Sequence, residues 1–314
     1  MKRFKTLAVF LLFPILFVVL FGCGSPEAPI FPDENLETQM GGYLHKAAGE
    51  EITTEELTFL QGLSLRGINI SELSGLEYCI NMNQLFICGT QISDISAISS
   101  LIDLKYLYLN DNQINDISGL SPLTKLDKLY LSENQVNDIS PLSSLANLSK
   151  LYLNDNRIYD VSQIAPLTKL TKLNISKNII SDISALSSLT ELTWLAIYQN
   201  NISDISNLSP LIRLGILTIG GNQVSDISAL SSLTNLTELY LYGNRISDIS
   251  AISSLSKLTV LNLSGNQISD IYPLVENENL DAGDIVDLRD NPLSEESINI
   301  YIPQLRDRGI NLKY

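Results

Sequence analysis

Apolar residues recur along the chain at fixed intervals, and the pattern is clearest between Leu148 and Leu167. With Leu148 counted as position 1, apolar side chains fall at positions 1, 4, 6, 11, 14, 17 and 20, and Asn156 stands at position 9. The same order begins again at Leu170, 22 residues after Leu148. A period that holds over many copies indicates a solenoid, in which each repeat forms one coil that stacks on the next.

Positions 3 to 7 of each repeat alternate between inward and outward side chains, which predicts a short β-strand with positions 4 and 6 buried. In the reference repeat these positions are Leu151 and Leu153. Each strand is expected to pair in parallel with the same segment of the next coil, about 4.7–4.9 Å away. The return segment contains the prolines Pro122, Pro141, Pro166, Pro210 and Pro273. Since proline lacks a backbone donor, we expect 3₁₀ or irregular structure there. Small residues such as Ser143 and Ala185 crowd the same segment, so we expect the strand side to be concave.

An asparagine ladder follows the strands, always at position 9. Its members are Asn112, Asn134, Asn156, Asn178, Asn200, Asn222, Asn244 and Asn266. Turn propensity alone favours asparagine in turns, but it does not explain eight copies at one phase of the repeat. An inward-pointing amide can donate to and accept from backbone groups that the turn leaves unpaired. We therefore predict that these side chains form a structural ladder inside the solenoid.

An aspartate recurs at position 13 of the repeats, usually before Ile-Ser, as at Asp160. Ahead of a short helical turn, such a carboxylate is expected to cap the backbone N–H groups one turn on. A regular row of acidic residues could also suggest calcium. Each copy lacks the second carboxylate and the glycine-rich loop that calcium repeats carry, so we expect no metal ion and no cofactor.

The repeat L-x-x-L-x-L-x-x-N-x-I-x-D-I-S-x-L-S-x-L resembles the bacterial leucine-rich repeats of the internalin type. The resemblance covers about residues 31–314 and is specific for the fold, but not for a ligand. It implies an α/β architecture: a curved leucine-rich-repeat solenoid with a parallel sheet on the concave face, a 3₁₀ or irregular convex side, a helical N-terminal cap and an α/β C-terminal cap. It also implies a binding module displayed on the cell surface.

Residues 1–22 read as an export signal, with a basic start at Lys2, Arg3 and Lys5 before an apolar run. The run from Leu7 to Phe21 is shorter than the roughly 20 residues of a membrane span. It ends at Gly22-Cys23, which resembles a bacterial lipoprotein processing site and implies lipidation of Cys23. Phe21 departs from the small residue usual at its place, and an ordinary cleaved signal with an incidental cysteine is the alternative. Residues 23–32 are expected to form a tether.

The two ends of the repeat array differ from its middle and are predicted to be caps. Residues 33–59 form the N-terminal cap, with Thr53 and Glu56 in the spacing of a capping box. Ten coils of 22 residues fill 60–279, and 280–314 form an irregular last repeat and the C-terminal cap. In that cap we expect a helix that begins after Ser294, kinks or ends at Pro303, and is capped near Gly309.

The end of the array also carries a displaced copy of the repeat pattern. Val286, Leu288, Asn291 and Leu293 take the places of positions 4, 6, 9 and 11. We therefore expect residues 280–314 to add one more coil before the chain leaves the solenoid.

Charge and residue content exclude several classes of function. Without residues 1–22, the chain has 17 basic and 35 acidic residues, a net charge of −18, which argues against a nucleic-acid partner. The single histidine, His45, falls in the N-terminal cap, and no nucleophile elbow or phosphate loop is present, so we predict no catalytic residues and no enzyme. Cys79 is expected to be buried and Cys88 to lie on the concave face, too far apart for a disulfide.

Aromatic and basic residues gather at the outward positions of the strands. Position 5 carries four consecutive aromatic residues, and position 3 carries three consecutive lysines. The candidate binding residues are Phe86, Tyr106, Tyr108, Lys128, Tyr130, Lys150, Tyr152, Lys172, Trp194, Tyr198, Tyr240 and Tyr242.

Exposed, clustered aromatic residues beside a few charges are typical of protein interfaces, which predicts a protein partner with an acidic or polar surface. Three alternatives stay open. Tyrosine is also favoured in exposed strands for structural reasons. The rings could instead bind a glycan, or the chain could be a surface-coat component without a discrete ligand.

Overall fold

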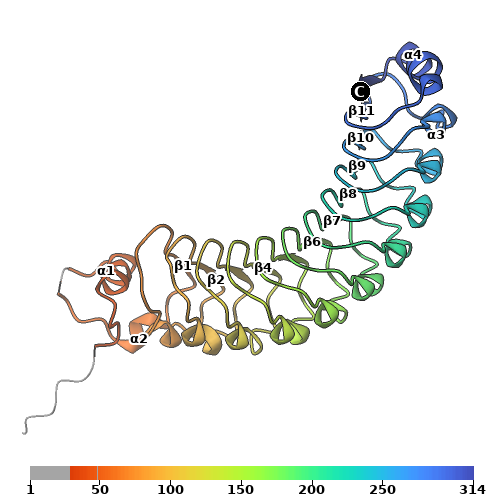
Figure 1. Ribbon diagram of the computed structural model, residues 1–314. Coiled ribbons are helices and arrows are strands. Elements are labelled where there is room, and N and C mark those ends of the chain that lie inside the picture. Colours follow the sequence, from red (N-terminus) through yellow and green to blue (C-terminus); the bar gives the residue numbers. More distant parts are fainter. Residues whose placement is uncertain (1–28, 48) are drawn as a thin grey trace, which may run out of the picture.

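The computed structural model shows one curved solenoid and describes residues 29–47 and 49–314 (Figure 1). The expected signal at 1–22 and the expected lipidation site Cys23 lie outside the described residues. A single parallel sheet of twelve strands, ordered β1 to β12 as in the sequence, lines the inner side of the curve. Short helical turns follow the outer side. The expected leucine-rich-repeat architecture, concave on its strand side, is confirmed.

Each strand contains three residues, and the middle side chain is buried in β1 to β11, as in β5, whereas Leu312 of β12 is half-buried. The strands are Gly62–Ser64 (β1), Gln84–Phe86 (β2), Tyr106–Tyr108 (β3), Lys128–Tyr130 (β4), Lys150–Tyr152 (β5), Lys172–Asn174 (β6), Trp194–Ala196 (β7), Ile216–Thr218 (β8), Glu238–Tyr240 (β9), Val260–Asn262 (β10), Ile285–Asp287 (β11) and Asn311–Lys313 (β12).

Neighbouring strands pair exactly one repeat apart through β10, so that Leu151 lies beside Leu173. The strands are shorter than the predicted positions 3 to 7. Bonding to the next coil continues past position 5, because the Leu153 N–H donates to the Asn174 carbonyl at 2.8 Å. The chain then turns out of the strand direction at Asp155, which has a positive φ of 60°.

The convex side is built mainly from 3₁₀ turns. These are Leu76–Tyr78 (η1), Ser96–Ser100 (η2), Ser118–Leu120 (η3), Ser140–Ser144 (η4), Ser162–Ile164 (η5), Ser184–Ser188 (η6), Ser206–Leu208 (η7), Ser228–Ser232 (η8) and Ser250–Ser254 (η9), followed by the α-helix Tyr272–Glu276 (α3). The predicted helix-capping role of the aspartates is wrong in its detail. The N-cap residue is the following Ile or Val, and the Asp160 carboxylate accepts from the Ser162 N–H, two residues on, at 2.8 Å.

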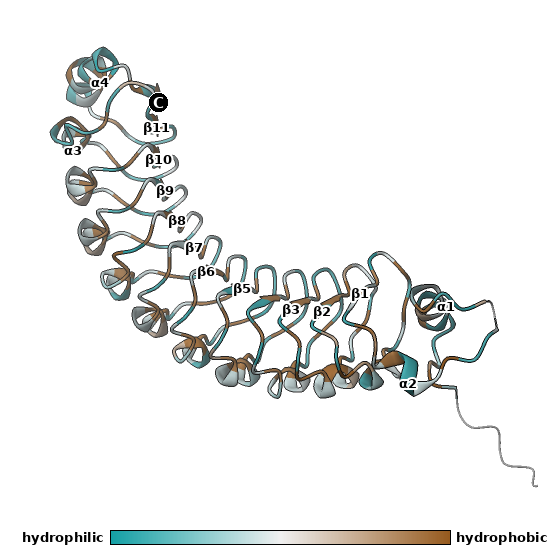
Figure 2. Cartoon of the chain, turned by 180° about the vertical axis from the view of Figure 1, so that it is seen from behind, coloured by the Kyte–Doolittle hydropathy of each residue, from teal (hydrophilic) through white to brown (hydrophobic). Residues whose placement is uncertain are grey.

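The core is one continuous column of leucine, isoleucine and valine side chains that runs from cap to cap. Apolar segments therefore recur in every coil along the solenoid (Figure 2). The residues at positions 4 and 6 of the reference coil, Leu151 and Leu153, are fully buried. Cys79 is also buried, and Cys88 is half-buried, both as free thiols.

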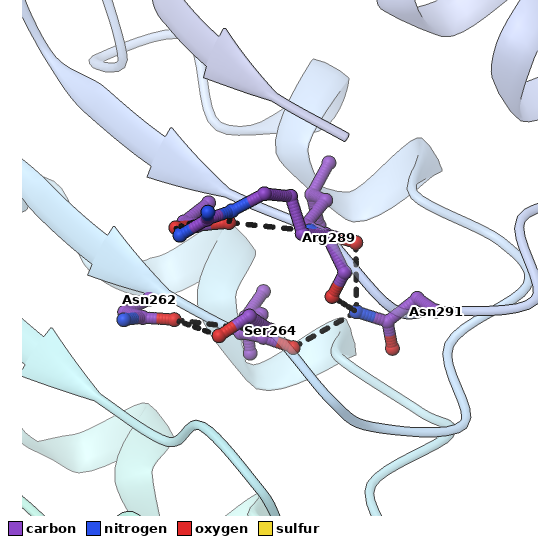
Figure 3. A network of polar contacts seen from close by, with 7 residues as sticks. Asn262, Ser264, Arg289 and Asn291 are labelled. Carbon is purple, nitrogen blue, oxygen red and sulfur yellow. Dashed lines mark hydrogen bonds and ion pairs between the residues drawn. The ribbon is translucent and has the colours of Figure 1, made fainter.

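The asparagine ladder borders this column and joins neighbouring coils, with its first three members half-buried and the five from Asn178 to Asn266 buried. The Asn156 amide nitrogen donates to the carbonyl of Leu131 in the preceding coil at 2.9 Å and to that of Leu153 in its own coil at 3.0 Å. Its oxygen accepts from the Val136 N–H at 2.9 Å. Asn291 extends the ladder into the irregular repeat, where Figure 3 shows it beside Arg289. Through these bonds Asn156 joins the backbone of two neighbouring coils.

The N-terminal cap contains the helices α1 (Glu34–Tyr43) and α2 (Thr54–Leu57). The predicted capping box of Thr53 and Glu56 is present at α2. The Tyr43 hydroxyl satisfies the free edge of β1, because it donates to the Ser64 carbonyl at 3.1 Å and accepts from the Ser64 N–H at 3.0 Å. His45 is exposed in the loop after α1.

The C-terminal cap contains β11, a π-helical turn at Ser297–Tyr301 (η10), the helix α4 (Ile302–Asp307) and β12. The helix does not end at Pro303, as one of our two expectations had it, but runs on to Asp307. Pro303 stands in the first turn of α4, directly after the π turn, where its missing N–H is tolerated. The Ser294 hydroxyl accepts from the Ser297 N–H, and Gly309 takes a φ of +86°, as expected for caps. Strand β12 was not predicted.

Candidate binding surface on the concave face

The pairing of the strands decides which side chains meet on the concave face. Side chains at positions 3 and 5 point outward on every coil, and pairing by one full repeat sets each beside its counterpart in the next coil. Tyr130 therefore lies between Tyr108 and Tyr152, and Lys150 between its two counterparts. All of these side chains are partly exposed. The structure thus brings the predicted residues of β2 to β6 into two parallel rows.

Four rings in the position 5 row form what we call the aromatic stack: Phe86, Tyr108, Tyr130 and Tyr152. Successive ring centroids lie 4.4, 4.3 and 4.5 Å apart, with interplanar angles of 18°, 10° and 7°. The outer face of Phe86 is covered by the Arg66 guanidinium, 4.9 Å from the ring centroid. At the other end Trp194 lies 5.9 Å from Tyr152, tilted by 34°. The faces of the inner rings are therefore covered by neighbouring rings. The ring edges and the tyrosine hydroxyl groups are left accessible to a partner.

Lys128, Lys150 and Lys172 form the lysine row, in register at position 3 of β4, β5 and β6. The Lys128 ammonium lies 4.7 Å from the centre of the Tyr106 ring. None of the three ammonium groups forms an ion pair within 4.0 Å with a residue that the structure describes. Three cations with no acidic partner are available on a strongly acidic protein.

Two hydroxyl groups of the stack, those of Tyr130 and Tyr152, stay protonated at neutral pH. Burial, and next the neighbouring rings of Tyr108 and Tyr152, raise the pKa of Tyr130 to about 12. Burial also raises the pKa of Tyr152. Tyr130 and Tyr152 therefore present neutral phenols, which can donate hydrogen bonds to carbonyl or carboxylate oxygens.

Three predicted tyrosines lie on other coils and do not join the stack. The Tyr240 hydroxyl donates to the Glu238 carboxylate at 2.8 Å. The Tyr242 ring lies against Gly220, where an added Cβ would come within 2.3 Å of ring atoms. A larger residue at position 220 would therefore force the Tyr242 ring to move. Tyr198 lies one coil before Gly220, and the sequence spacing had grouped all three with the binding residues.

The residues at position 8 have a left-handed backbone conformation that the sequence did not reveal. Gly67, Gly89, Gly221, Gly243 and Gly265 occupy this place in some coils, all with positive φ. Asp111, Glu133, Asp155, Lys177 and Gln199 take the same conformation in the third to seventh coils, with φ between 51° and 60°. The recurrence of glycine at one phase was the available signal. The three acidic members form an acidic rim beside the aromatic stack, and Asp155 pairs with Lys177 at 3.3 Å.

The described part of the chain offers neither a metal site nor a membrane-spanning helix. Among residues 29–47 and 49–314, no group of three or more His, Cys, Asp and Glu side chains is arranged to hold a metal ion. No helix in the same ranges combines the length and the apolar character that crossing a bilayer requires.

The fold and the repeats define a leucine-rich-repeat protein. Comparison of the chain with a family model and with solved structures gives the same class. The family model for leucine-rich repeats (two copies) matches residues 102–144, 146–188 and 234–276. A crystal structure of the internalin InlF from Listeria monocytogenes is 35% identical, with 91% of this chain and 92% of that chain covered and a TM-score of 0.76. The chain belongs to the internalin family of leucine-rich-repeat proteins.

Two other solved structures from Listeria monocytogenes are similar to this chain. Internalin C2 is 33% identical over 66% of this chain and 92% of that chain, with a TM-score of 0.63. The functional domain of InlJ is 22% identical over 90% of this chain and 60% of that chain, with a TM-score of 0.76, and supports the fold alone. A search of curated protein sequences gives no significant match.

Proposed function

We propose that the mature chain is a non-catalytic, cell-surface binding module that recognises a protein partner through the aromatic stack and the lysine row. The observation that carries this proposal is the arrangement of four partly exposed rings beside three ammonium groups that form no ion pair with the described residues, all on β2 to β6. Tyrosine is enriched where interfaces concentrate their binding energy, and lysine ammonium groups steer an acidic partner toward the same surface.

The geometry of the stack favours a protein over a glycan. A sugar ring that stacks on tyrosine needs a free aromatic face. The inner rings, Tyr108 and Tyr130, have neighbours about 4.4 Å away on both faces, and Arg66 covers the end of the stack at Phe86. The exposed edges and hydroxyl groups suit polar and backbone groups of a polypeptide, since a phenol combines apolar contact with a hydrogen-bond donor.

The charges around the stack constrain how a partner lies on it. Positions 3 and 8 are five residues apart, about 16 Å in an extended chain. That distance exceeds the screening length of about 8 Å at physiological salt. The lysine row and the acidic rim of Asp111, Glu133 and Asp155 therefore act separately. We expect the partner's acidic groups on the side where the strands begin.

The same proposal includes export and a lipid anchor at Cys23. It rests on the basic start, the apolar run to Phe21 and the cysteine directly after Gly22. Stable anchoring requires more than one acyl chain, because each buried methylene contributes only about 0.8 kcal/mol. The link between the anchor and the solenoid is shorter than the tether expected at 23–32, because Phe31 is only 3% exposed and belongs to the hydrophobic core.

Site-directed photo-crosslinking tests the proposed binding face. A benzophenone amino acid replaces Tyr130 in the stack or, as the control, Tyr159, a tyrosine outside it that is 63% exposed. Each mature protein is irradiated in the natural surroundings of the cell. We expect one recurrent protein adduct at position 130 and none at position 159. Equal labelling of the same proteins at both positions would contradict recognition through the stack.

A further inference from the structure

The lysine row does not end at β6 but continues into two apolar residues. In register at position 3, Lys128 pairs with Lys150, Lys150 with Lys172, Lys172 with Trp194, and Trp194 with Ile216. The five side chains stand on consecutive strands from β4 to β8, and each is partly exposed. One line along the solenoid axis therefore changes from cationic to apolar between β6 and β7.

The two halves of this line differ in what they can bind. The three ammonium groups have no carboxylate of the described chain within 4.0 Å, so they are available to an external anion. Trp194 leans toward Tyr152, with ring centroids 5.9 Å apart, and Ile216 follows on the next strand. Beside Trp194, position 5 is the buried Ala196, so no large outward side chain covers the indole from that strand.

We propose that this line recognises a single polypeptide segment that runs along the solenoid axis, with acidic side chains over the lysines and an apolar or aromatic side chain over Trp194 and Ile216. The inference rests on the proposed function and adds to it the chemistry and the direction of the partner. The acidic half of the segment faces the N-terminal coils, and its apolar half faces the middle of the solenoid.

The spacing of the strands sets the spacing of the two features in the partner. Lys150 and Ile216 are separated by three strand intervals, about 14 Å at the usual separation of 4.7–4.9 Å. An extended segment rises about 3.3 Å per residue and covers this distance in about four residues. The partner segment is thus expected to place its apolar residue about four positions from the centre of its acidic group.

A random peptide library displayed on phage tests the inference without a known partner, with the intact mature chain as bait. We expect enrichment of peptides in which acidic residues precede or follow an apolar residue at a spacing of three to five. Reversal of the lysines (Lys128→Glu, Lys150→Glu, Lys172→Glu) should exchange the acidic preference for a basic one and keep the apolar residue. Trp194→Ala with Ile216→Ser should remove the apolar preference and keep the acidic one.

Two controls make the outcome unambiguous. Charge reversal at three lysines outside the concave strands (Lys125→Glu, Lys169→Glu, Lys257→Glu) should leave the enriched peptides unchanged. Thermal unfolding confirms that each bait is folded, and Ile216→Ser alone replaces the double variant if that variant is not folded.

Each contrary outcome has a distinct meaning. If enriched peptides depend on Tyr130 but keep their acidic residues after lysine reversal, the two-part line is wrong while concave-face binding stands. If no enriched peptide depends on Tyr130, Lys150 or Trp194, the proposed function itself is wrong.

Discussion

The side-chain oxygen of Asn178 accepts a hydrogen bond from the backbone N–H of Ile158, 20 residues earlier and one coil away, at 2.9 Å. The nitrogen of the same amide donates to the carbonyl of Leu153 at 3.0 Å and to that of Ile175 at 3.1 Å. One buried amide thus forms hydrogen bonds with backbone groups of two neighbouring coils, where each coil turns away from the sheet.

Replacement of this amide should destabilise the solenoid at its centre. Asn178→Ala leaves buried backbone groups without partners, which we expect to lower the free energy of unfolding by about 1–3 kcal/mol. The matched control is Asn115→Ala, an exposed asparagine outside the ladder, with an expected change within about 0.5 kcal/mol. Urea denaturation followed by circular dichroism measures both. Similar losses for the two variants would contradict the role of the ladder.

Because the backbone at position 8 is left-handed, introducing a glycine there and removing one should have opposite effects on stability. Glu133 has a φ of 58° there, so Glu133→Gly should stabilise the protein by about 0.5–1 kcal/mol. Gly243 has a φ of 63°, and an added Cβ would meet only ordinary contacts at 3.6 Å or more. Gly243→Ala should therefore cost about 1 kcal/mol through the backbone alone. Differential scanning calorimetry of the two variants checks the pair, and changes of the same sign would be incompatible with this account.

The N-terminal cap should lose stability in acid through Glu56. Its hydrogen bond with Lys46, and next those with Thr53, lower the pKa of Glu56 from 4.5 to about 2. Because the folded-state pKa is the lower one, this contribution is present above pH 4.5 and disappears as the pH falls toward 2. The melting temperature of Glu56→Gln should be lower than that of the parent at pH 7, and the two should converge near pH 2. A constant difference across this range would show that Glu56 does not titrate as described.

The proposed anchor at Cys23 makes a prediction about partitioning. Cys23→Ser removes the only thiol to which the lipid could be attached at the processing site, so the protein should leave the membrane fraction or stall before cleavage. Detergent phase separation of the parent and the variant, followed by mass determination of the N-terminus, measures both effects. If the two proteins partition alike, Cys23 carries no anchor.

The repeat period made most of this fold predictable. Because coils stack by translation, a residue's phase in the repeat fixes its place in space, and Tyr108, Tyr130 and Tyr152 could be aligned before any coordinates. The same reasoning placed Asn156 inside and Asn291 in the irregular repeat. Strand β12 escaped because Asn311–Lys313 is too short and lies outside the periodic pattern.

Features that depend on backbone conformation or side-chain rotamers were not accessible in this way. Position 8 carries Asp, Glu, Lys and Gln beside the glycines, so its left-handed conformation was hidden in the middle coils. The aspartates, such as Asp160, stand one residue before the cap because the buried Ile or Val takes that place. The repeat phase predicted a ladder of stacked rings, but the spacing and tilt of neighbouring rings follow from their rotamers.

The affinity of the triple variant Tyr108→Ala, Tyr130→Ala, Tyr152→Ala for the crosslinked partner tests the central claim most directly. The rings point outward, so each truncation should change stability by only about 1 kcal/mol. Central aromatic residues of an interface can each contribute about 2 kcal/mol or more to binding. Isothermal titration calorimetry should therefore show at least a hundredfold weaker binding, whereas Tyr159→Ala should bind like the parent. A folded triple variant that binds with unchanged affinity would contradict recognition through the aromatic stack.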